Sequence, residues 1–107
     1  MLQPIALAVL LAAFEDEAAA NNAAKHRFDD VAARALAVFE MVNNLEARVR
    51  ENGLTLHPDI RGRKLRVEMA LDDAEAAIKE NRWKEVRKST ERASAHLERL
   101  EKALTGR

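Results

Sequence analysis

The chain has 107 residues, with 18 basic and 18 acidic side chains and no cysteine. This length predicts one domain with a modest core, and the zero formal net charge gives the whole chain no electrostatic preference for nucleic acid or anionic membranes. The absence of cysteine excludes disulfides, thiolate zinc sites and iron–sulfur clusters, and the low glycine and proline content favours helix over sheet.

Residues 4–14, Pro-Ile-Ala-Leu-Ala-Val-Leu-Leu-Ala-Ala-Phe, would be apolar on every side of a helix. The run is too short to span a bilayer, which needs about 20 apolar residues. It matches the apolar part of a secretory signal, although no basic residue precedes it and residues 15–17 are acidic. We therefore expect residues 1–20 to be a signal peptide. The alternative is a retained first core helix over 3–20, with membrane contact only through residues 4–14.

Residues 21–107 are expected to form a single helical-bundle domain, whose first helix covers about 25–52 after a weak break at Asn21-Asn22. Gly53 is a good left-handed C-cap for this helix. Its apolar stripe alternates steps of three and four residues, which places the stripe on one side of the helix. The stripe consists of Phe28, Val31, Ala35, Val38, Val42, Leu45 and Val49.

Two further helices are expected over about 59–80 and 82–105. Pro58 suits the first turn of the former. The five-residue step from Ile78 to Trp83 breaks the stripe alternation, which predicts a turn at Asn81-Arg82 and not one long helix. The last helix has the clearest stripe, made of Trp83, Val86, Thr90, Ala93, Leu97, Leu100 and Leu104. The sequence therefore predicts an all-α, antiparallel helical bundle.

Metal and cofactor sites have few candidate ligands. Helical bundles commonly bind metals through Glu-x-x-His, and none of the three histidines has a glutamate three residues before it. His26 with Asp29 and Asp30 is the remaining metal candidate, although acidic residues at a helix start also compensate the helix dipole. Met41 and Met69, with a histidine, could bind haem, copper or a small ligand, but methionine is more often core filler. We expect no metal or cofactor.

The densest basic cluster is Arg61, Arg63, Lys64 and Arg66, which we call the basic cluster. It is a candidate for binding polyanions through phosphate groups. No aromatic side chain that could stack on bases lies near it in the sequence, and nucleic acid is therefore not an expected partner.

The function expected from these patterns is a non-enzymatic interaction or structural module. The chain has no cysteine nucleophile and no glycine-rich phosphate loop, and Asp72 and Asp73 diverge by about 100° on a helix. We expect an exported protein, periplasmic or secreted, if residues 1–20 are a signal, and a cytoplasmic one otherwise. Phe39 and Trp83 stand at the edges of their stripes, and we predict that one or both lie at a self-association surface. The expected partner is a protein or a second copy.

Overall fold

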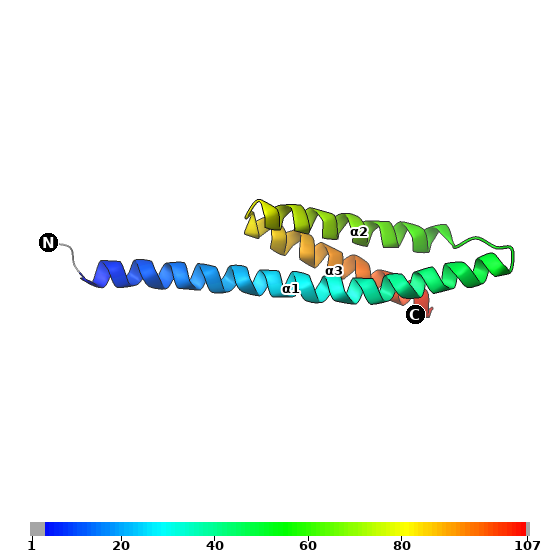
Figure 1. The fold of residues 1–107 in the computed structure, drawn as a ribbon, viewed down its shortest axis with the longest axis horizontal. Coiled ribbons are helices and arrows are strands. Elements are labelled where there is room, and N and C mark those ends of the chain that lie inside the picture. The colour runs from blue at the N-terminus through cyan, green and yellow to red at the C-terminus, as the bar shows by residue number, and fades with distance from the viewer. Residues whose placement is uncertain (1–3, 107) are drawn as a thin grey trace.

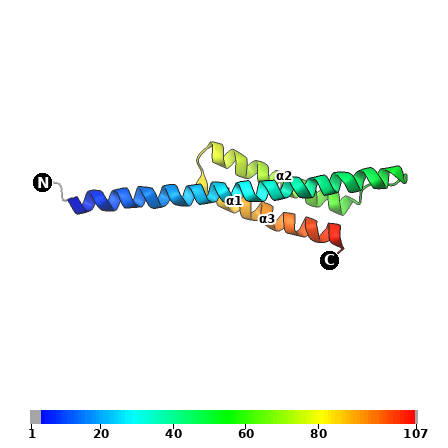
Figure 2. The ribbon, with the colours of Figure 1, turned by 60° about the horizontal axis from the view of Figure 1, so that its bottom comes forward.

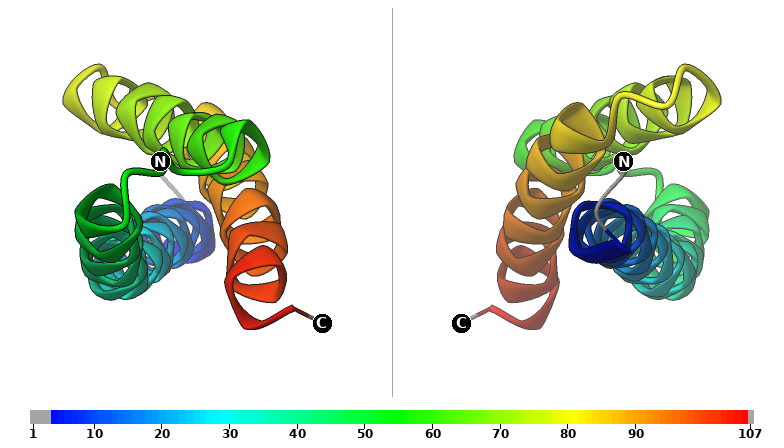
Figure 3. Two further views of the ribbon diagram at one scale, coloured as in Figure 1. Left: turned by 90° about the vertical axis from the view of Figure 1, so that its right-hand side faces the viewer. Right: turned by 90° about the vertical axis from the view of Figure 1, so that its left-hand side faces the viewer.

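The computed structural model describes residues 4–106, with side chains from residue 16 onward, and this part of the chain folds into three α-helices without a strand (Figure 1). The helices are α1 (Pro4–Glu51), α2 (Pro58–Lys79) and α3 (Trp83–Thr105). Viewed along the long axis, they surround a common interior (Figure 3). The all-α antiparallel bundle predicted from the sequence is confirmed.

The two turns lie where the sequence predicts them. At the first, Leu54 N–H donates to the Val49 carbonyl at 2.8 Å, with Gly53 in the left-handed region at φ 73°. At the second, Arg82 N–H donates to the Ala77 carbonyl at 2.9 Å, with Asn81 at φ 57°. Both are Schellman motifs, which need a residue that tolerates positive φ, and glycine and asparagine do so best.

The break predicted at Asn21-Asn22 is wrong, because α1 continues through both residues. An asparagine in a helix interior costs only several tenths of a kcal/mol relative to alanine, and alanines flank this pair on both sides. Residues 4–20 therefore do not fold back as a fourth helix on the other three. They extend the axis of α1 past the end of the α2–α3 hairpin (Figures 1 and 2).

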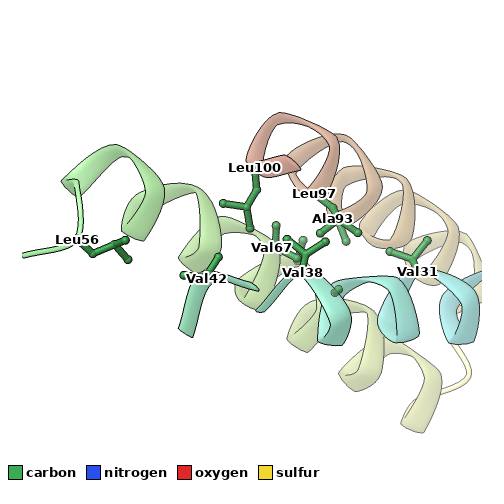
Figure 4. Close-up of a cluster of buried hydrophobic side chains, with 10 residues drawn as sticks. Val31, Val38, Val42, Leu56, Val67, Ala93, Leu97 and Leu100 are labelled. Atoms are coloured by element: carbon green, nitrogen blue, oxygen red, sulfur yellow. The ribbon is translucent and has the colours of Figure 1, made fainter. Parts of the chain in front are cut away.

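The core lies where the apolar stripes of α1 and α3 meet the buried side chains of α2 (Figure 4). Small side chains on α2 let α3 approach closely, and the larger side chains come from α1 and α3. Ten buried residues form the main cluster: Val31, Ala35, Val38, Val42, Leu56, Val67, Ala70, Ala93, Leu97 and Leu100. A second, smaller cluster near the α2–α3 turn contains Ala24, Ala77 and Val86, with Ile78 and Trp83 packed against it.

Two arginines of α1 also tie it to α3. Arg27 Nε lies 3.0 Å from Glu91 Oε1, and Arg34 donates to Glu101. Both pairs are exposed, so each contributes at most about 1 kcal/mol, and apolar burial supplies most of the stability. Because both pairs advance in the same direction along the two helices, α1 and α3 run parallel, with α2 antiparallel to each.

Replacing Leu97 by alanine should destabilise the fold by about 2–5 kcal/mol, because its fully buried side chain would leave a cavity among all three helices. Leu65→Ala is the matched control, since Leu65 on α2 is 54% exposed and should cost under about 0.5 kcal/mol. Urea unfolding followed by circular dichroism measures both. Equal effects of the two variants would contradict this core.

Candidate interaction surfaces

An open cavity of about 670 Å³ lies where α1 passes the α2–α3 turn. The hairpin contributes Trp83, which is half-buried and packs against the second cluster. The lining residues are Ala18, Ala19, Asn21, Asn22 and Lys25 of α1, with Ile78, Asn81 and Trp83 of the hairpin. The indole ring of Trp83 thus lies at the rim of a concave surface, beside a stretch of α1 that is rich in small side chains.

Beyond this cavity, no other helix of the described residues 4–106 lies beside the N-terminal part of α1 (Figures 1 and 2). We call residues 4–17 the projecting segment. Its backbone is helical, and its sequence from residue 4 to residue 14 is entirely apolar. Within the described residues, no helix has a stretch apolar and long enough to cross a membrane.

Phe39, the other predicted surface residue, lies half-buried between α1 and α2 against the main cluster. Lys64 Nζ lies 5.6 Å from the centroid of its ring, within the range of a cation–π interaction. One turn earlier, Leu36 is 67% exposed. Phe39 is about 21 Å along α1 from the cavity at Lys25, so Phe39 and Trp83 do not form one patch. Their role in self-association stays a prediction.

The basic cluster does not form one basic face, because neighbouring helix residues diverge by about 100°. Arg63 Nε donates to Asp59 Oδ2 at 2.9 Å, and this hydrogen bond holds the pKa of the Asp59 carboxyl below its usual value. Lys64 lies over Phe39 and 3.5 Å from Glu68. The structure therefore gives no support to a concentrated polyanion surface at residues 61–66.

His96 lines a small cavity of about 180 Å³ between α2 and α3, together with Arg66, Met69 and Arg92. Burial lowers the pKa of the His96 imidazole, and the charges of Arg99, Arg66 and Arg92 lower it further. Arg92 also donates to Asp73 Oδ2 at 3.3 Å. This cationic neighbourhood is unsuited to a metal cation.

The remaining candidates for ligand binding lie apart on the surface. His26 is exposed on α1, and Asp29 is paired with Lys25 at 2.8 Å. Among the residues whose side chains are described, no three His, Cys, Asp or Glu side chains gather as metal ligands would. Met41 and Met69 are 52% and 57% exposed, so neither is a core residue, and Met69 lines the small cavity beside His96.

Sequence reasoning missed the contacts of α1 with α3 through Arg27 and Arg34. The available signal was their spacing of seven residues, which places both on one side of a helix beside the apolar stripe. It placed Thr90 in the α3 stripe but did not predict that its hydroxyl is buried without a hydrogen-bond partner among the described residues. Thr90 lines a largely apolar cavity of about 400 Å³ with Ala20, Ala23 and Ala24.

No protein-family model, curated protein or solved structure matches the chain. Function must therefore be argued from the surfaces of this molecule. Three of them stand out: the projecting segment, the cavity beside Trp83, and the exposed edge of α1 at Leu36.

Replacing Thr90 by valine should stabilise the fold by about 1 kcal/mol, because it removes a buried unpaired hydroxyl at nearly constant volume. Thermal and urea unfolding measure the change. Thr90→Ser is the comparison, since it keeps the hydroxyl and loses a methyl group. Destabilisation by valine would show that the hydroxyl is hydrogen-bonded in solution, and would contradict this expectation.

Lowering the pH from about 7.5 to 5.0 should cost less stability in His96→Gln than in the unchanged protein. The folded state disfavours the imidazolium, so below the ordinary pKa of 6.5 the unfolded chain binds more protons. The stability that neutral His96 provides is present above pH 6.5. It is lost as the pH falls through the lowered pKa of His96 in the folded state. Urea unfolding at both pH values measures the difference, and an equal loss in both proteins would contradict it.

Proposed function

We propose that the protein is a non-enzymatic helical interaction module that self-associates through α1. The observation that carries this proposal is the length of α1, which has 48 residues against 22 and 23 in the two helices of the hairpin. The hairpin supplies a compact base for the middle and C-terminal parts of α1. It leaves the most apolar stretch of the chain without a partner helix.

An unaccompanied apolar helix is costly in water. Exposed apolar surface costs about 25 cal/mol per Å². A second surface that covers the projecting segment would offset this cost. Exposed Leu36, further along α1, and half-buried Trp83 of the hairpin offer apolar contacts to such a surface.

Export stays a prediction from the sequence of residues 1–20. All residues of the two buried clusters lie at Ala24 or later, so cleavage after Ala20 would leave the core intact. The intact mass of the protein from native cells distinguishes the two fates. A full-length chain keeps the projecting segment as an interaction element, whereas loss of residues 1–20 outside the cytoplasm would identify an exported module.

Light scattering at micromolar concentration should give twice the mass of one chain, with dissociation on dilution. Leu10→Glu should shift the protein towards the single-chain mass, because it places a charge in the apolar stretch 4–14. Leu54→Glu is the matched control, since Leu54 is 62% exposed in the α1–α2 loop and should leave the mass unchanged. A strictly monomeric full-length protein would disprove self-association.

A further inference from the structure

The charges around Asn21 are arranged with opposite signs at equal distances. Residues 15–17 are Glu-Asp-Glu and residues 25–27 are Lys-His-Arg, and only alanine and asparagine lie between the two blocks. Residue 17 and residue 25 are each four positions from Asn21. We call these stretches the acidic block and the basic block.

The two blocks cannot neutralise each other within one chain. α1 is continuous through both of them, so their nearest members, eight residues apart, are separated by about 12 Å along the helix axis. Side-chain pairs on a helix form at separations of three or four residues. A second helix in the opposite direction would bring each block against its complement.

This part of α1 is accessible to such a helix. Between residues 16 and 27, Ala24 alone is buried, and the other side chains are half-buried or exposed. Ala18, Ala19 and Asn21 also line the open cavity beside Trp83. The hairpin therefore borders the side of the stretch that carries Ala18 and Asn21, where the cavity is open, and leaves the other sides uncovered.

We propose that two copies of this chain associate through antiparallel α1 helices that cross near Asn21, with the acidic block of each copy against the basic block of the other. The proposal rests on the proposed function and specifies its partner and its surface. A two-fold axis near Asn21 makes the contact isologous, and the face of α1 that carries Glu17, Asn21 and Lys25 at four-residue steps supplies the contact of each block. The association is thereby closed at two copies.

The residues at the crossing suit a close approach of two helices. Ala18 lies three residues before Asn21 and so on the same face, its side chain is the smallest that still favours helix, and the interaxial distance depends on side-chain size at the contact. Asn21 would meet its counterpart near the axis. A single asparagine at such a position fixes the register of paired helices, because its amide finds a partner in only one alignment.

The same arrangement covers the projecting segment. A residue before Asn21 faces the residue at the same distance after it in the partner, so residues 4–14 lie along residues 28–38 of the partner subunit. On that side of α1, four-residue steps lead from half-buried Phe28 through half-buried Ala32 to Leu36, which is 67% exposed. Residues 4–14 of one copy would thus pack on the partly exposed apolar edge that runs from residue 28 to residue 36 of the other copy.

The ion pairs that the basic block already makes do not prevent its contact with the acidic block of a second copy. Lys25 is paired with Asp29 at 2.8 Å and Arg27 with Glu91 at 3.0 Å, and the side chains of Lys25 and Arg27 are 43% and 48% exposed. Exposed pairs of this kind contribute little. The acidic block adds a second carboxylate partner for each cation without removing it from its present one.

Charge reversal tests the arrangement in the full-length chain. E15K/D16K/E17K and K25E/H26E/R27E should each weaken the dimer on the order of 100-fold, because like charges then face each other. An equimolar mixture of the two variants should form a mixed dimer by sedimentation velocity at low salt. The control E40K/E51K/D72K changes three exposed carboxylates elsewhere and should keep the dimer of the unchanged protein.

A cysteine at the crossing gives a second, independent test, because the chain has no cysteine of its own. Asn21→Cys should form a disulfide between copies under mild oxidation, since a residue near the two-fold axis lies close to its counterpart. Asn44→Cys, exposed and far along the same helix, should not.

The outcomes separate this arrangement from the proposed function. A dimer that survives both charge reversals and is not linked through Asn21→Cys overturns the antiparallel crossing and leaves self-association standing. A full-length chain that is monomeric at all concentrations overturns both. Rescue by the mixture together with linkage through Asn21→Cys supports the crossing, and loss of residues 1–20 from the native protein overturns it.

Discussion

Burial of one apolar stripe of α1 against α3 is the contact on which the shape of the molecule depends. Val31, Val38 and Val42 pack with Leu97 and Leu100 in the main cluster. α2 closes this core from the other side, and its alanines let it lie close to α3. Because the stripe of α1 fits only the length of the hairpin, the hairpin determines which part of α1 is buried and which part is left for other contacts.

The difference in helix length links this packing to function. A hairpin of two helices with 22 and 23 residues cannot accompany a helix of 48 residues along its whole length. The excess lies at the N-terminal end, where the sequence is most apolar and is followed by the acidic block. One continuous helix thus carries both the buried stripe of the core and the projecting segment.

Much of the fold could be predicted from apolar periodicity. The α3 stripe is buried at Val86, Thr90, Ala93, Leu97 and Leu100, as its spacing predicts, and both turns lie at residues that tolerate positive φ. The continuity of α1 could not, because two asparagines shift helix propensity too little to decide between a break and a helix. The sequence pattern also did not predict that the side chains of the basic cluster point in different directions around α2. The acidic block and the basic block are visible in the sequence. They can face their complements in a second copy only if one continuous helix contains both blocks.

The order of the helices along the chain has a consequence for folding. The hairpin joins neighbouring segments, whereas the hydrogen bonds of Arg27 and Arg34 to α3 connect residues 64 and 67 positions apart. Contacts between distant residues carry a larger loop-closure entropy and form later than local ones. Chain topology therefore favours formation of the hairpin before α1 docks on α3. Release of α1 from α3 would then be a sub-global opening of the molecule.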